Sequence, residues 1–232
     1  MILVLWDIDR TLLYAGDTDR LVYREVFRAV VGRPATALPA KGTGVTMPLA
    51  VRELLAANGV EEPEVDRLAP RIVARLPEEL RRHRANLPRD GHLMPGAVEA
   101  LAAIRGDASL VPSIVTGNLR ESAEIKLSAF GLTEYVDLAL GGYASDDPHR
   151  PALVRIAQAR AERAHGRPFT RANTVIIGDS LQDVHTGREG GARVVGVASG
   201  TASAEALADT GADDVLEGLT DPVRLMEAVR AG

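Results

Sequence analysis

Hydrophobic positions recur with different periods along this chain, and the change of period predicts its organisation. A short, uninterrupted apolar run over residues 2–6, which ends at Asp7, predicts a buried strand over residues 2–7. From residue 17 to about residue 88, apolar side chains recur at helical spacing, and Gly32 with Pro34 ends the first of four expected helices. The pattern therefore predicts a small helical bundle inserted directly after the first strand.

Beyond residue 88 the pattern alternates between strand-like and helix-like segments. Further strands are expected at 110–115, 136–140, 174–177, 193–197 and 214–216. Helices are expected at 97–104, 119–130, 152–164, 181–189 and 222–229. Such alternation is typical of a parallel sheet covered by helices on both faces. We expect a Rossmann-like α/β core of residues 1–14 and 89–232, interrupted by a four-helix-type cap of residues 15–88.

Composition narrows the class of protein further. The chain has 232 residues, a net charge of −5 and no cysteine. The negative charge argues against a nucleic-acid partner, and the lack of cysteine excludes disulfides and thiol catalysis. No apolar stretch approaches the roughly 18 residues of a membrane span, and no basic region marks a signal peptide. We expect a cytoplasmic protein, monomer or homodimer, that acts on a small molecule without contacting a membrane.

Chemically active side chains follow three of the expected strands. They are Asp7 and Asp9, then Thr116, Gly117 and Asn118, then Asp179 and Asp183. Taken singly, each group has a structural explanation, such as an acidic turn after a strand or the capping of the next helix. However, ligands bind at the carboxyl ends of the strands in open parallel sheets, so these loops are expected to meet. Clustered carboxylates repel one another, which indicates a divalent cation such as Mg²⁺ and, beside it, a phosphate group.

These three loops, in this order, resemble the motifs of the haloacid dehalogenase (HAD) superfamily of phosphate-transferring hydrolases. The glycine-rich stretch 178–200 resembles the phosphoglycolate-phosphatase-like subgroup, and the insertion at about 15–88 resembles the helical cap of that subgroup. The resemblance implies a Mg²⁺-dependent phosphatase that hydrolyses a small phosphomonoester through an aspartyl-phosphate intermediate.

The resemblance also implies roles for individual residues. Asp7 would be the nucleophile, and Asp9 would protonate the leaving alcohol and then deprotonate water. The phosphate would be held by Thr116, Gly117 and Asn118. The Mg²⁺ ligands would be Asp7, the backbone carbonyl of Asp9, Asp179 and Asp183, the last either directly or through water.

Two positions depart from the family pattern. Arg10 stands where the family commonly has glycine, and a left-handed backbone there would cost a non-glycine residue roughly 1–3 kcal/mol. The family also has a lysine beside the nucleophile and the phosphate. The corresponding loop here offers Arg150, whereas Lys126 lies in the helix after Asn118. Because the chain has only one other lysine, Lys41, the scarcity of this residue favours Lys126.

The segment 41–48 resembles the cap loop that reaches over the substrate in capped family members. Gly44 and Thr46 are therefore candidates for selecting the leaving group, although the same residue types simply form loops.

Other functions compete with a phosphatase. A dehalogenase lacks the second aspartate, which is present here as Asp9, and a phosphomutase tends to have a β-branched apolar residue where Thr11 stands. A phosphonatase requires a Schiff-base lysine in the cap, where Lys41 is the only candidate. A signalling receiver domain has its phosphoacceptor on a middle strand and no helical insertion. A ligand-binding relative without activity would explain Arg10 and Arg150.

Overall fold

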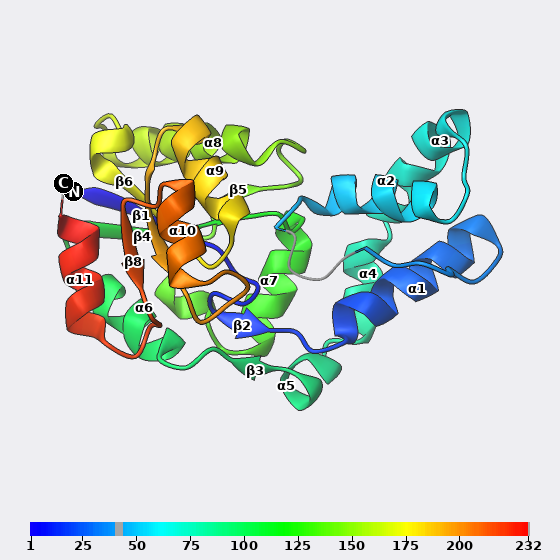
Figure 1. Cartoon of the computed structure of the whole chain (residues 1–232), viewed down its shortest axis with the longest axis horizontal. Coiled ribbons are helices and arrows are strands. Elements are labelled where there is room, and N and C mark those ends of the chain that lie inside the picture. The colour runs from blue at the N-terminus through cyan, green and yellow to red at the C-terminus, as the bar shows by residue number, and fades with distance from the viewer. Residues whose placement is uncertain (40–43, 232) are drawn as a thin grey trace.

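The computed structural model describes residues 1–39 and 44–231, and its centre is a six-stranded parallel sheet (Figure 1). The strands lie in the order β5-β4-β1-β6-β7-β8, and each pairs with its neighbours in parallel. Their bounds are β1 (Ile2–Trp6), β4 (Leu110–Thr116), β5 (Gly142–Tyr143), β6 (Thr174–Gly178), β7 (Arg193–Val197) and β8 (Asp214–Leu216). The expected α/β class is confirmed.

Both faces of the sheet are covered by helices, which explains why β1 is apolar throughout. Leu3 and Leu5 pack into one hydrophobic cluster, whereas Val4 and Trp6 pack into the other, on the opposite face. The first face is covered by α8 (Arg150–His165), α9 (Leu181–Gly190) and α10 (Ala204–Thr210). The second is covered by α6 (Ala97–Arg105), α7 (Arg120–Ala129) and α11 (Pro222–Arg230).

The inserted helices gather beyond one end of the sheet (Figure 1). They are α1 (Thr18–Val31), α2 (Met47–Ala57), α3 (Glu62–Val73) and α4 (Leu76–Arg82), and α5 (Asn86–Asp90) leads back to the core. These helices and the loops between them are called the helical group below. The chain leaves and returns at one place, because β2 (Leu13–Tyr14) pairs with β3 (His92–Leu93) in antiparallel fashion. The limit expected at residue 88 for the inserted segment lies within α5.

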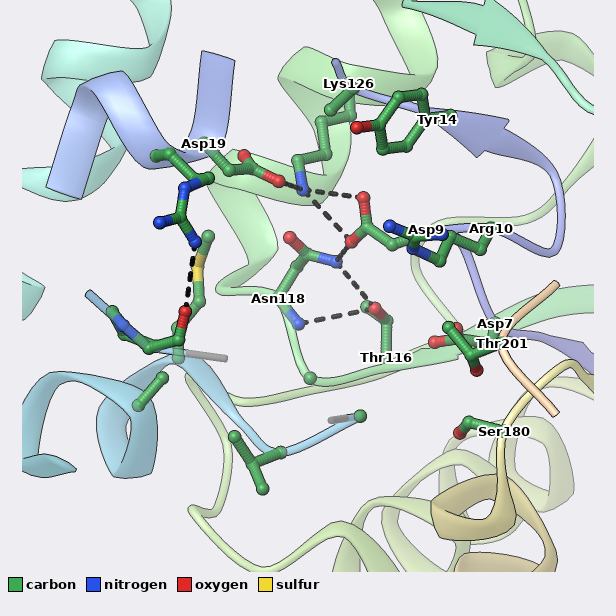
Figure 2. A pocket seen from close by; sticks show the side chains of 18 of the residues that line it. Asp7, Asp9, Arg10, Tyr14, Asp19, Thr116, Asn118, Lys126, Ser180 and Thr201 are labelled. Atoms are coloured by element: carbon green, nitrogen blue, oxygen red, sulfur yellow. Dashed lines mark hydrogen bonds and ion pairs between the residues drawn. The ribbon is translucent and has the colours of Figure 1, made fainter. Parts of the chain in front are cut away.

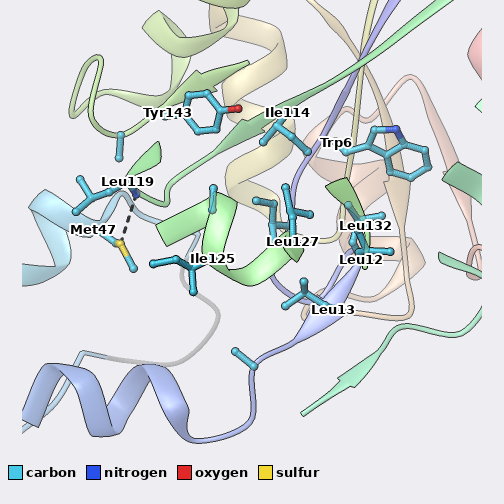
Figure 3. Packing of buried hydrophobic residues seen from close by; sticks show 14 of the residues in the cluster. Trp6, Leu12, Leu13, Met47, Ile114, Leu119, Ile125, Leu127, Leu132 and Tyr143 are labelled. Carbon is cyan, nitrogen blue, oxygen red and sulfur yellow. Dashed lines mark hydrogen bonds between the residues drawn. The ribbon is translucent and has the colours of Figure 1, made fainter. Parts of the chain in front are cut away.

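The junction between the helical group and the sheet is tightly packed. In Figure 3, the side chain of Met47 lies against the start of α7, where its sulfur accepts a hydrogen bond of 3.5 Å from the Leu119 N–H. The backbone N–H of Met47 also donates to the Gly117 carbonyl at 2.8 Å. These contacts hold the beginning of α2 against the loop that follows β4.

The strand expected at 136–140 is absent, and the edge strand is β5 instead. The Asp137 N–H donates to the Pro112 carbonyl at 2.9 Å, so the segment does run beside β4. Proline has no N–H to return on that side, and a ladder begins only at Val115. The sequence pattern also does not predict α5, α10, or the two-residue strands β2 and β3, which are too short to show a period.

Candidate active site

The loops after β1, β4 and β6 meet at one end of the sheet, as their position in a parallel sheet predicts. Together with the helical group they enclose a pocket of about 180 Å³ (Figure 2). Residues that line it include the predicted Asp7, Asp9, Gly44, Thr116, Gly117, Asn118, Lys126, Arg150 and Asp179. The helical group contributes Asp19, Arg20, Tyr23, Met47 and Ala50.

Three buried carboxylates form the floor of this site. Oxygen atoms of Asp7, Asp179 and Asp183 lie within 4.8 Å of one another. Burial and the nearby charge of Asp183 raise the pKa of Asp7 well above its ordinary value, against the opposing effect of Arg150. Burial and Asp183 raise the pKa of Asp179 as well. The fold therefore concentrates negative charge at this point.

Asp179 is held in place by two threonines. The hydroxyl of Thr11 donates to one of its carboxylate oxygens at 3.0 Å. The other oxygen accepts from the Thr201 N–H at 2.7 Å and from the Thr201 hydroxyl at 2.8 Å. A Cβ at Gly200 would lie 2.1 Å from this second oxygen, so glycine is required there for the close approach. Thr201 was not predicted from the sequence, since a single threonine in a loop carries no pattern.

Asp183 has a structural role and faces the site at the same time. One of its oxygens accepts from the N–H and the hydroxyl of Ser180, at 3.0 and 2.6 Å, in a capping box at the start of α9. Its other oxygen accepts from Arg150. Helix capping and charge clustering, which the sequence left as alternatives, thus apply to the same residue.

The cation that contacts Asp7 is Arg150, at the start of α8. Its guanidinium donates to Asp7 at 3.3 Å, to Asp183, and to the Gly44 carbonyl at 2.6 Å. Burial acts to lower the pKa of Arg150, but Asp183 and Asp7 together raise it above its ordinary value. Lys126, which the scarcity of lysine favoured for this position, contacts Asp9 instead.

The residues present fit a divalent metal ion. Three carboxylates and one guanidinium leave two negative charges unbalanced among the described groups that meet at this floor. Carboxylate oxygens are the donors that Mg²⁺ prefers. A divalent cation held by Asp7, Asp179 and Asp183 would balance the charge.

Asp9 lies apart from the floor and has its own partners. The ammonium group of Lys126 donates to both carboxylate oxygens of Asp9, at 2.8 and 3.0 Å. The side-chain amide of Asn118 donates to Asp9 at 2.7 Å and to the Thr116 hydroxyl at 2.8 Å (Figure 2). Asn118 therefore links the loops after β1 and β4. It does not cap α7, which has Leu119 at the capping position.

The loop before α2 packs on the core. A Cβ at Gly117 would lie 2.7 Å from the Val45 carbonyl oxygen, and one at Gly44 would lie 2.7 Å from Gln182 Cβ. Gly44 lines the pocket with its backbone, whereas Thr46 is buried and its hydroxyl donates to the Pro148 carbonyl at 2.8 Å. Geometry thus gives Thr46 a role in holding this loop. Lys41, the lysine required by a phosphonatase, lies outside the described residues.

Arg10 adopts the left-handed backbone conformation that the family pattern suggests. Its φ is 66°, and among the described residues other than glycine it alone has a positive φ. Its N–H donates to the Leu13 carbonyl at 2.6 Å, and its guanidinium lies 5.0 Å from the ring centre of Tyr14. The turn after β1 is therefore formed with arginine in a position where glycine would be free of strain.

One curated protein and several solved structures are similar to this chain. The chain is 30% identical over 119 residues to the probable phosphatase IndB of Dickeya dadantii (strain 3937), which covers 50% of this chain and 48% of that protein. The chain thus matches about half the length of this relative. CbbY from Rhodobacter sphaeroides, in complex with xylulose-(1,5)-bisphosphate, superposes with a TM-score of 0.71 at 18% identity, over 95% of this chain and 96% of that chain. A hydrolase from Pseudomonas syringae gives a TM-score of 0.68 at 21% identity, over 98% of each chain.

These solved structures share the fold of the chain. The match to a family model extends this likeness to the sequence itself. The model described as haloacid dehalogenase-like hydrolase matches residues 4–188. That range contains the three loops of the candidate site and the whole helical insertion. The chain therefore belongs to the haloacid dehalogenase-like hydrolase family.

Proposed function

We propose that this protein is a Mg²⁺-dependent phosphatase that hydrolyses a small-molecule phosphomonoester through an aspartyl-phosphate on Asp7. The observation that carries the proposal is the setting of Asp7. It lies at the carboxyl end of the central strand, beside one arginine and two further buried carboxylates, and it lines the pocket.

The residues of the site divide the chemistry between two steps. In the first, an oxygen of Asp7 forms a bond to phosphorus while the bond to the leaving oxygen breaks, and Asp9 donates a proton to that oxygen. In the second, Asp9 takes a proton from water, which attacks the phosphorus and releases Asp7. Thr116, the Gly117 N–H and Arg150 hold phosphate oxygens. Asp7, Asp179 and Asp183 would hold Mg²⁺, whose charge would offset the repulsion between Asp7 and the incoming phosphate.

The pocket supports a small substrate. Its volume of about 180 Å³ has room for a phosphate with a compact leaving group, and the helical group forms its opposite wall. That wall combines apolar contact from Leu38, Val45 and Met47 with the polar ends of Arg20 and Tyr23. A covered pocket of this size disfavours phosphoproteins as substrates. Phosphoglycolate, to which the sequence subgroup points, is the first compound to test.

The proposal also concerns where and with what the protein acts. No helix in the part of the chain that the structure describes is long and apolar enough to span a membrane. We infer a cytoplasmic enzyme, monomeric or homodimeric, whose partner is a phosphorylated metabolite rather than a nucleic acid or a membrane.

The test is phosphate release from a panel of small phosphomonoesters, with Mg²⁺ or with EDTA. Wild type, Asp7→Asn and Asp66→Asn are compared, because Asp66 is an exposed aspartate of α3, remote from the pocket lining. We expect Mg²⁺-dependent turnover that Asp7→Asn abolishes and Asp66→Asn retains. A folded wild type that binds Mg²⁺ but releases no phosphate across the panel would refute the enzyme and favour a ligand-binding relative.

A further inference from the structure

Lys126 joins Asp9 to a second carboxylate that comes from the helical group. The ammonium nitrogen lies 2.8 Å from an oxygen of Asp19, in the first turn of α1, as well as 2.8 and 3.0 Å from the two oxygens of Asp9. In Figure 2 the lysine extends from α7 between the two aspartates. Its side chain is 1% exposed, whereas those of Asp9 and Asp19 are 37% and 30% exposed.

The ammonium group is surrounded by carboxylate oxygens. Two of them belong to Asp9 and one to Asp19, and all three lie within hydrogen-bond distance of the nitrogen, which carries three N–H donors. Burial acts to lower the pKa of Lys126, and the charges of Asp19 and Asp9 more than reverse that effect. Removal of Asp19 would leave one buried donor without its partner and the ammonium free to turn about its last bond.

The orientation of Asp9 depends on this ammonium. Both oxygens of Asp9 accept from Lys126, and one of them also accepts from Asn118. A proton donor must lie within hydrogen-bond reach of the leaving oxygen, so a rotated carboxyl group transfers its proton less well. Neither the HAD motifs nor the spacing of the sequence marks Asp19 for such a role.

We propose that Asp19 is a positioning residue that acts through Lys126 to align Asp9 for proton transfer to the leaving group. This inference rests on the proposed phosphatase function. In the step concerned, the leaving oxygen keeps the electron pair of the broken bond to phosphorus and takes the proton of the Asp9 carboxyl. Asp19 contacts neither the substrate oxygen nor the phosphorus, and it transfers no proton.

The leaving group provides a test that separates alignment from general damage. An alkoxide is a poor leaving group and needs the proton of Asp9, whereas a nitrophenolate departs without protonation. Loss of alignment therefore slows the first step for alkyl phosphates and spares it for aryl phosphates. The second step, in which Asp9 deprotonates water, is common to both, so the comparison is made on kcat/KM, which reports the first step. Damage to Asp7, to the metal site or to the fold slows both kinds of substrate alike.

The experiment measures kcat and KM with Mg²⁺ for glycerol phosphate and p-nitrophenyl phosphate. The variants are Asp19→Asn, Asp19→Glu and a control, Glu124→Gln, which removes an exposed acid paired with Arg120 on the same helix as Lys126. We expect Asp19→Asn to lower kcat/KM for glycerol phosphate roughly 10- to 100-fold and kcat/KM for the aryl ester less than about threefold. Asp19→Glu is expected to restore part of kcat/KM for glycerol phosphate, and the control is expected to match wild type.

A double variant tests whether Asp19 acts through the lysine. If it does, Asp19→Asn causes no further loss in a Lys126→Met background. Equal losses of kcat/KM for both esters, or independent losses in the double variant, would overturn the inference. If Lys126→Met does not fold, the comparison of Asp19→Asn with Asp19→Glu on the two esters still tests whether Asp19 positions Asp9. Wild type that hydrolyses neither ester nor any of the wider panel would instead refute the proposed function itself.

Discussion

Replacement of Asp7 by asparagine is expected to stabilise the protein in EDTA while it abolishes turnover. The oxygens of Asp7, Asp179 and Asp183 lie within 4.8 Å of one another. At an effective dielectric constant of about 20, unit charges at that distance repel by about 3.5 kcal/mol, and Asp7 faces two of them. At the same dielectric constant, the attraction between Asp7 and Arg150, which are 3.3 Å apart, stabilises the folded state by about 5 kcal/mol. The balance is a repulsion of about 2 kcal/mol, which the neutral amide removes.

Thermal unfolding in EDTA at neutral pH measures this gain. For a chain of this length, about 2 kcal/mol corresponds to a rise in Tm of roughly 4–8 °C. The sign also depends on pH. The pKa of Asp7 is raised above 3.8, so its charge costs stability only as the pH rises from 3.8 through the raised pKa. The advantage of Asp7→Asn should therefore vanish below pH 3.8.

Stabilisation by Mg²⁺ and a control variant provide two further tests of this prediction. Wild type should gain about 2.7 kcal/mol when Mg²⁺ is a hundredfold above its Kd, whereas Asp7→Asn should gain less because it offers the metal one charge fewer. The exposed control Asp66→Asn should leave the Tm unchanged. A Tm of Asp7→Asn at or below that of wild type in EDTA, at neutral pH, would refute the charge balance drawn from the structure.

Three further predictions follow from particular contacts. Gly200→Ala would place a Cβ 2.1 Å from an Asp179 oxygen. We therefore expect the variant to fold but to lose most of its turnover and its stabilisation by Mg²⁺, which activity assays and thermal melting curves measure. Unchanged stabilisation by Mg²⁺ would contradict this expectation. Arg10→Gly relieves a φ of 66° but adds chain entropy to the unfolded state, and denaturant unfolding should show a change within about 1 kcal/mol. Asp107→Asn should lower the Tm at neutral pH, because hydrogen bonds from Ser109 and Arg230 lower the pKa of Asp107 to about 2. The stability that this carboxylate contributes is present above pH 3.8 and lost as the pH falls through about 2, so the two proteins should converge in acid.

Local patterns were sufficient for much of the fold. The apolar run of β1, the alternation that gives β4, β6 and β7, and the helical spacing within α1 are properties of neighbouring residues, and each produced its element. The pattern failed at 136–140, where Pro112 of the adjacent strand cannot complete a ladder. Periodicity could also not detect short elements such as β2, because two residues carry no period.

The sequence alone predicts that the loops after β1, β4 and β6 meet, since parallel strands bring their carboxyl ends together. That rule predicts one cluster of Asp7, Asp179 and Asp183, whose oxygens do lie within 4.8 Å of one another. Only the tertiary structure decided which cation faces Asp7. The rarity of lysine favoured Lys126, but the packing of α8 directs Arg150 to Asp7 and the packing of α7 directs Lys126 to Asp9.

The partners of these groups were likewise decided by packing. Asp19 meets Lys126 across a separation of 107 residues, and Thr201 meets Asp179 across 22. A motif records the order and spacing of residues within one segment. The distance between two side chains from different segments depends instead on how helices and strands pack, which no local pattern contains.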